Sequence, residues 1–156
     1  MPIFSLPGPF GIGGFGEEAY GFIDRIAEMG FRLWQLLPFT IVGEGNSPYS
    51  SISAFAGNYL FIDPRQLQAE GLLSEEEVRE CIYPGTPHTA DYPFAGEKKL
   101  SALRKAFSRL NGESLEKIEI FSKEQAWLSD FALFMFLQKK YKGISWREWA
   151  EEIKRE

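Results

Sequence analysis

The first clear periodicity of apolar positions lies between Glu17 and Ala27. Apolar side chains recur there at the three- and four-residue spacing of one helix face, at Tyr20, Phe22, Ile23, Ile26 and Ala27. Glu17 and Glu18 suit the positive end of a helix dipole, and Gly30 suits the position just beyond the last turn. The pattern therefore predicts an amphipathic helix that starts near Glu17 and ends before Gly30.

A short apolar run follows, from Phe31 to Leu37, and Pro38 ends it. A run of this length after a helix and before a proline predicts a mostly buried strand. Residues 38–58 are rich in Gly, Asn and Pro and predict a second loop, after the Gly- and Pro-rich opening of the chain. A loop of this length is uncommon in a compact domain and is usually functional.

From Ile62 onward the pattern becomes helical. Asp63 with Pro64 predicts an N-cap followed by a proline in the first turn, and Gly71 closes that helix. Further helical segments are predicted after a capping box at 74–77 and over 97–110, 115–121, 123–140 and 146–154, the last two opened by capping boxes at Ser122 and Ser145. Residues 83–96, with three prolines and two glycines, predict a loop.

This order of elements predicts an α/β fold, because a helix, a strand and a preceding apolar start are the opening of a βα array. One helix and one or two strands cannot close a sheet, and an eight-stranded barrel typically needs about 250 residues. The 156 residues therefore predict either a small mixed domain or part of a larger fold.

Composition and charge exclude several classes of function. The net charge is −5, and bases are interspersed with acids, as in Glu97-Lys98-Lys99, which is typical of solvated helix faces and argues against a nucleic-acid partner. No apolar run of 18 residues and no signal-peptide pattern are present, so we expect no membrane span and a cytoplasmic location. A single cysteine and a single histidine exclude a disulfide framework and a Cys/His zinc site. We expect Cys81 to be buried and His88 to lie on the surface.

Residues Gly11 to Gly16 fit the pattern G-x-G-x-x-G and lead directly into the predicted helix. That spacing can place a pyrophosphate at a helix N-terminus. The surrounding sequence does not fit, because Pro7 and Pro9 precede the glycines and the next predicted strand ends without a carboxylate. A nucleotide-binding domain is therefore the weakest of the alternatives.

Several segments, taken in order, resemble the amylomaltases, the 4-α-glucanotransferases of the α-amylase-related glycoside hydrolase family 77. The most specific is the segment Ser47-Pro48-Tyr49-Ser50-Ser51-Ile52-Ser53-Ala54-Phe55-Ala56-Gly57-Asn58. The others are Ser5-Leu6-Pro7-Gly8-Pro9-Phe10-Gly11-Ile12-Gly13, Trp34-Gln35-Leu36-Leu37-Pro38, Ala90-Asp91-Tyr92, Trp127-Leu128-Ser129-Asp130-Phe131 and Trp146-Arg147-Glu148-Trp149. The match spans nearly all of this chain but only the opening part of a family member.

The resemblance implies the first units of a (β/α)₈ barrel with two active-site loops over residues 1–62, and a mostly helical subdomain over residues 63–156. It implies transfer of α-1,4-glucan segments in starch and glycogen metabolism, with retention of configuration and without a cofactor. The family's catalytic carboxylates match no residue here and would lie beyond Glu156. Retaining chemistry needs two carboxyl groups about 5–5.5 Å apart, and the acids of this sequence cluster on helices instead. We therefore expect no catalytic residue in this chain and no activity of the chain alone.

Two residues of the long loop are candidate substrate contacts by this resemblance. Tyr49 matches the family tyrosine that packs against a sugar near the scissile bond; the alternative is a tyrosine that fills the core. Ser47 matches a residue close to the acceptor sugar; the alternative is a hydroxyl that bonds the backbone of its own loop. Glu44 stands where many members carry a tyrosine of a second glucan-binding site, so the resemblance does not extend to that site.

One alternative function and one expectation about solution behaviour remain beside the family resemblance. The chain could instead be a glucan-binding or interaction module that kept the Tyr49 segment without catalysis. Part of a barrel exposes apolar faces that neighbouring elements would cover, so we expect the chain to self-associate when it is made alone.

Overall fold

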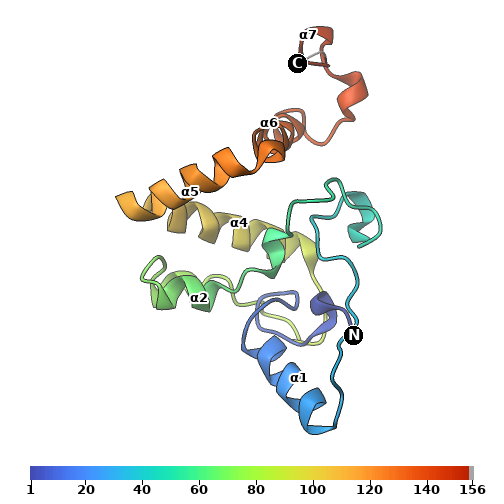
Figure 1. Ribbon diagram of the computed structural model, residues 1–156, viewed down its shortest axis with the longest axis vertical. Helices are drawn as coiled ribbons and strands as arrows, with labels where there is room; N and C mark the ends of the chain where they lie inside the picture. Colours follow the sequence, from blue (N-terminus) through green and yellow to red (C-terminus); the bar gives the residue numbers. More distant parts are fainter. Residues whose placement is uncertain (155–156) are drawn as a thin grey trace. The chain divides into compact units, whose positions relative to one another are not determined.

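The computed structural model describes residues 1–154 and divides into two compact units, Met1–Asn111 and Gly112–Glu156. The first unit contains the 3₁₀ turns η1 (Ile3–Ser5), η2 (Glu44–Asn46) and η3 (Tyr59–Phe61) and the helices α1 (Glu17–Glu28), α2 (Pro64–Ala69), α3 (Glu75–Arg79) and α4 (Tyr92–Ser108) (Figure 1). The second contains α5 (Gly112–Glu124), α6 (Ala126–Lys140), η4 (Trp146–Glu148) and α7 (Glu151–Lys154). Residues 63–111 therefore belong to the same compact unit as the first 62 residues.

The helices predicted from local caps in the first half of the chain are confirmed. Helix α1 begins after Gly16, carries Glu17 and Glu18 in its first turn, and is followed by Gly30 at φ +86°. Helix α2 has the predicted cap, since the carboxylate of Asp63 accepts from the backbone N–H of Arg65. Helix α3 has the complete predicted capping box.

Helices α4, α5 and α6 begin or end at other residues than predicted. Helix α4 begins at Tyr92 rather than near Glu97, because Asp91 caps it by accepting from the N–H of Phe94. Pro93 then occupies the first turn, where its missing N–H is harmless. Residues 123–140 do not form one helix either: α5 runs to Glu124 and α6 starts after Gln125, so Ser122 lies inside α5 and is not an N-cap.

The strand predicted over residues 31–37 is wrong for this structure. No β-strand is present among residues 1–154, which contain only two isolated bridges, Thr40 with Gly57 and Val42 with Ser51. Residues 31–37 run as a single segment after α1 (Figure 1), and residues 32–38 make no backbone hydrogen bond to another described segment. A strand exists only through the ladder to its neighbour, so an apolar run without a partner remains irregular. The described chain is mostly helical.

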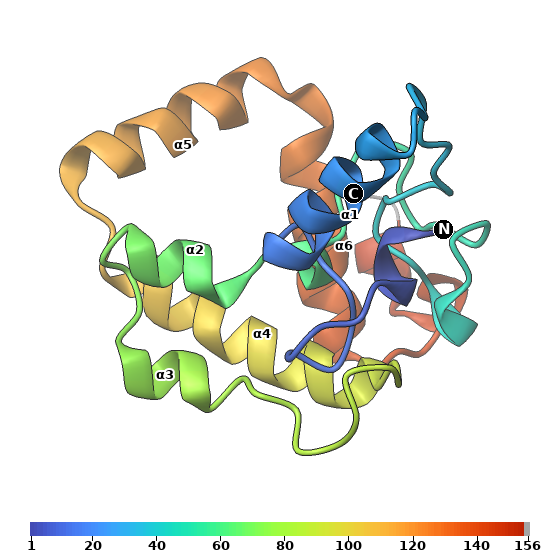
Figure 2. The same ribbon diagram turned by 90° about the horizontal axis from the view of Figure 1, so that it is seen from below.

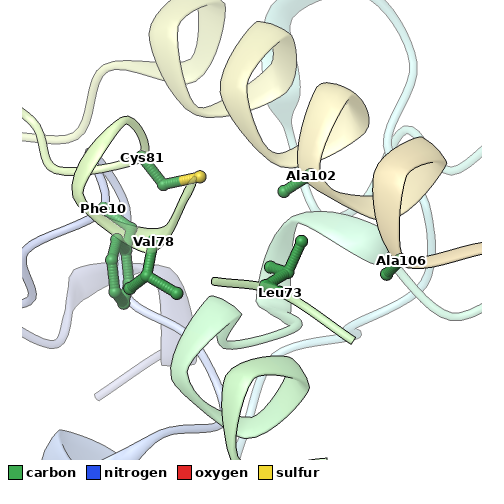
Figure 3. Packing of buried hydrophobic residues seen from close by; sticks show 6 residues of the cluster. All are labelled: Phe10, Leu73, Val78, Cys81, Ala102 and Ala106. Carbon is green, nitrogen blue, oxygen red and sulfur yellow. The ribbon is translucent and has the colours of Figure 1, made fainter. Parts of the chain in front are cut away.

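The core of the first unit lies where the glycine-rich opening segment meets α3 and α4. One buried cluster consists of Phe10, Leu73, Val78, Cys81, Ala102 and Ala106 (Figure 3). In Figure 3 the side chains of Leu73 and Cys81 point toward the face of α4 that carries the two alanines. Helix α2 packs against both α3 and α4 (Figure 2). Cys81 is buried as expected, and burial raises the pKa of its thiol, which argues against a nucleophile.

The second unit is organised around Trp149. Its indole is 6% exposed, lies 5.4 Å from the ring centroid of Tyr141 and 5.8 Å from that of Phe134, and donates through Nε1 to the carbonyl of Ile144. Ser145 caps η4 by accepting from the N–H of Arg147, but the single helix predicted over 146–154 is wrong: η4 ends at Glu148, Trp149 is extended, and α7 begins only at Glu151. None of the helices of residues 1–154 is long and apolar enough to cross a membrane.

Candidate functional site

Residues 39–58, here called the Tyr49 loop, close on themselves through backbone hydrogen bonds. The N–H of Asn58 donates to the carbonyl of Phe39 at 3.1 Å, and the N–H of Ile41 donates to the carbonyl of Ala56 at 2.9 Å. Further toward the tip, the N–H of Gly43 donates to the carbonyl of Ser50 at 2.9 Å. Ile41, Ala56 and Asn58 are buried, so the base of the loop is anchored in the first unit.

The serines of the loop bond to its own backbone. The hydroxyl of Ser51 donates to the carbonyl of Ile41 at 2.7 Å and accepts from the N–H of Ser53. The hydroxyl of Ser53 accepts from the N–H groups of Phe55 and Ala56. Short hydroxyl side chains stabilise irregular backbone in this way, and the close spacing of the serines is the feature of the sequence that could have indicated it. These residues define the shape of the loop.

Tyr49 lies near the tip of this loop, and 75% of its surface is exposed. The alternative that it fills the core is therefore wrong. Ser47 is half-buried, and its hydroxyl oxygen accepts from the N–H of Tyr49 at 3.3 Å. The local backbone bond that was the alternative for Ser47 is thus present. It fixes the backbone at Tyr49 and leaves the hydroxyl hydrogen available for a second partner.

The base of the loop rests on two buried polar residues that the sequence patterns did not single out. Asn58 is 6% exposed, and its Oδ1 accepts from the N–H of Leu60 at 3.0 Å. Lys99 is 2% exposed and donates from Nζ to the carbonyl of Leu60. The expectation that Lys99 belongs to a solvated helix face is wrong: burial lowers the pKa of its ammonium to about 8, a shift that the negative charge of Asp63 partly offsets.

The glycines of the G-x-G-x-x-G segment serve close packing. A Cβ at Gly13 would lie 2.2 Å from the carbonyl oxygen of Ile3, and one at Gly14 would lie 2.8 Å from that of Phe61. A Cβ at Gly16 would lie 1.8 Å from Oδ2 of Asp63. The N-terminal end of α1 thus faces a carboxylate, which would repel a pyrophosphate. The glycine motif is explained by steric need without a nucleotide.

Carboxylates that lie close together in the first unit are paired with bases. Arg65 donates to Asp63 and Glu18 at 2.6 and 2.7 Å, and it also reaches Glu17. Arg109 donates to Glu77 and holds the pKa of that carboxyl down at about 2. A carboxylate held as an anion by a guanidinium is not poised to donate a proton to a leaving group.

The described residues contain no candidate metal site, and the lone histidine lies at the surface. Among residues 1–154, no group of three His, Cys, Asp or Glu side chains is placed to hold a metal ion. His88 lies exposed in the loop before α4, as expected, and its backbone N–H donates to the hydroxyl of Thr86.

Comparisons with known proteins agree on one family. Residues 1–156 match the family described as 4-alpha-glucanotransferase. The 4-alpha-glucanotransferase of Aquifex aeolicus is 46% identical over 158 aligned residues, which are 99% of this chain and 31% of the relative. The enzyme of Thermus thermophilus is 39% identical over 97% of this chain and 30% of its own length.

A solved structure has the same arrangement. The amylomaltase from Streptococcus agalactiae in complex with acarbose superposes with a TM-score of 0.89 at 37% sequence identity, over 97% of this chain and 31% of that one. The chain thus spans about a third of the length of the relatives it matches.

Proposed function

Because the chain belongs to the 4-alpha-glucanotransferase family, we propose that its Tyr49 loop binds an α-1,4-glucan, with Tyr49 and Ser47 as the sugar contacts. In the proposal, the whole protein transfers glucan segments between acceptors with retention of configuration. This chain then contributes a wall of the substrate cleft and none of the reacting carboxylates.

The observation that carries the proposal is an exposed tyrosine on a backbone that is already ordered. An aromatic ring at this position offers a flat apolar face to the C–H groups of a pyranose. The serine bonds around Ile41 and Phe55 hold the loop in shape before any sugar arrives. Such preorganisation lowers the conformational entropy that binding has to overcome.

Ser47 has a narrower role in the proposal. Its oxygen is engaged by the N–H of Tyr49, so its remaining capacity is to donate one hydrogen bond to a sugar hydroxyl. The same bond couples the two contacts, since a sugar that draws on Ser47 also steadies the backbone of Tyr49. The complex of the streptococcal amylomaltase with acarbose supports a carbohydrate as the ligand class.

The barrel assignment is also a proposal. In the mostly apolar run 31–37, residues 32–37 make no backbone hydrogen bond to another described segment, and 90% of the surface of Leu33 is exposed. We propose that this run becomes a strand when neighbouring strands of a (β/α)₈ barrel supply its ladder, with residues 1–62 opening the barrel and residues 63–156 forming the helical subdomain.

The test is maltoheptaose binding by the chain, measured by titration calorimetry. Tyr49→Ala should weaken binding at least about tenfold, since it removes the ring on which the sugar stacks. Tyr49→Phe keeps the ring, and its dissociation constant should stay within about threefold of the wild type. Tyr20→Ala is the matched control, because Tyr20 is an exposed tyrosine on α1 (57%) outside the loop. Equal affinity of the wild type and Tyr49→Ala would refute the proposal.

A second measurement addresses catalysis. The chain is incubated with maltotriose, and released glucose is assayed. We expect none, because Asp63, Glu18 and Glu77 are held by guanidinium groups and the family's catalytic carboxylates match no residue of this chain. Glucose release that disappears in Tyr49→Ala would show that the chain is catalytic by itself and would overturn this part of the proposal.

A further inference from the structure

Lys99 places an ammonium group in the interior beneath the base of the Tyr49 loop. The residue is 2% exposed, on the face of α4 that the first unit covers. Its Nζ donates to the carbonyl of Leu60 and lies 5.8 Å from the centroid of the Phe10 ring. Removing a cation from water is unfavourable, so the position has to be explained by the contacts that the ammonium makes.

The contact with Leu60 acts on the loop because Leu60 lies two residues after the loop's last residue, Asn58. The N–H of Leu60 donates to Oδ1 of Asn58, and the carbonyl of Leu60 accepts from Lys99. The backbone N–H of Asn58 in turn donates to the carbonyl of Phe39 at the other end of the loop. A single chain of bonds therefore runs from α4 through η3 to both ends of the loop.

We propose that Lys99 is a positioning residue for glucan binding: by holding Leu60, and through it Asn58, it fixes the base of the Tyr49 loop so that the Tyr49 ring stays presented to the sugar. The inference rests on the function proposed above. Lys99 is too deeply buried to touch a ligand and acts only through the loop.

The charges around Lys99 give this role a pH signature. Asp63, Glu18 and Cys81 favour its protonated form and Arg65 disfavours it, but burial dominates and brings the pKa to about 8. Water restores the ordinary value of about 10.4, so protonation favours states in which the base opens and Lys99 is wetted. Opening should therefore become rarer as the pH rises from about 8 toward 10.

The experiment measures amide hydrogen exchange in the 156-residue chain together with maltoheptaose affinity. In Lys99→Met the carbonyl of Leu60 loses its donor, and protection of the loop amides of Ile41 and Asn58 should fall about tenfold or more while α3 amides keep theirs. Affinity should fall at least about threefold, because the ring is no longer held in place. Lys98→Met is the matched control: Lys98 pairs at the surface with Glu97 and should change neither quantity.

The outcomes separate the two proposals. Unchanged loop protection in Lys99→Met, or an equal loss throughout Met1–Asn111, would overturn the positioning role. Wild-type protein that does not bind maltoheptaose would overturn the proposed function, and the exchange data would still decide on Lys99.

If Lys99→Met does not fold, the wild type decides alone. Its loop protection, corrected for the intrinsic pH dependence of exchange, should rise about threefold or more between about pH 7 and about pH 9.5. Amides of Ile41 and Asn58 that exchange as fast as those of an unstructured peptide would refute the role, because the chain of bonds from Lys99 would then not hold them.

Discussion

Replacing Asp63 by alanine tests how α1 is joined to the start of α2. The carboxylate is 5% exposed and performs two tasks. It caps α2 by accepting from the N–H of Arg65 at 2.8 Å, and it accepts from the guanidinium of the same residue at 2.6 Å. Arg65 then extends to Glu18 on α1, 47 residues earlier in the sequence. The pair of acids holds the pKa of Arg65 above its usual range.

The magnitude follows from these two tasks. Loss of an N-cap destabilises by about 1 kcal/mol, and loss of a charged partner in a mostly buried pair by about 1.5–3 kcal/mol. Arg65 is partly exposed and keeps Glu18, so we expect about 2–4 kcal/mol for Asp63→Ala. Asp63→Asn retains an oxygen for the cap and should lose about half as much.

The assay is urea unfolding followed by far-UV circular dichroism. Asp63→Ala should lower the midpoint by about 1 M or more at an unchanged slope. Asp24→Ala, which removes an exposed acid from α1, serves as the control and should stay within about 0.5 kcal/mol of the wild type. If Asp63→Ala were as stable as this control, the account of Asp63 as a buried link between α1 and α2 would be refuted.

Three further predictions concern packing, pH and association. Gly16→Ala should destabilise the fold by about 1–3 kcal/mol, since the new Cβ would collide with Asp63. Gly21→Ala, inside α1 with open space around it, should stabilise the fold by about 0.5–1 kcal/mol. Thermal unfolding measures both variants, and equal effects would refute the steric account. The carboxyl of Glu77 has a lowered pKa in the folded chain, so its ionised form stabilises the fold. This contribution is complete above the unfolded-state pKa near 4.5 and is lost as the pH falls toward 2. In Glu77→Gln the free energy of unfolding should therefore depend less on pH between about 4.5 and 2. The chain should self-associate through exposed apolar side chains, and Leu33→Lys should reduce the sedimentation coefficient at high concentration; a wild-type monomer would contradict this.

The parts of the fold that were predicted correctly depend on neighbours in sequence. The caps of α2 and α3 join residues two or three positions apart, so their geometry follows from the residue types alone. The start of α4 was not predicted although its cap is equally local, because Pro87 and Pro93 flank Asp91 and prolines favour loops. The break at Gln125 was missed because helical periodicity continues on both sides of it.

In the candidate site too, the features that depend on contiguous residues were predicted and those that depend on distant residues were not. The Tyr49 segment was recognised because its residues are contiguous, and the structure adds that the ring is exposed and the serines hold the backbone. Lys99 was misplaced because the bond that explains it reaches 39 residues back to Leu60. Charge pattern along a helix cannot indicate which lysine faces the interior when the covering segment is remote in sequence.

By itself, the amino-acid sequence determined the family, the starts of α1, α2 and α3 and the identity of the Tyr49 loop, because each depends on short contiguous segments. Only the tertiary structure decided that Tyr49 is exposed, that Lys99 is buried, and that Gly13, Gly14 and Gly16 are needed for close packing. The apolar run at 31–37 shows where prediction from sequence stops and tertiary structure decides. Its composition favours a strand, but strand formation is a property of a pair of segments, and the described chain offers that run no partner.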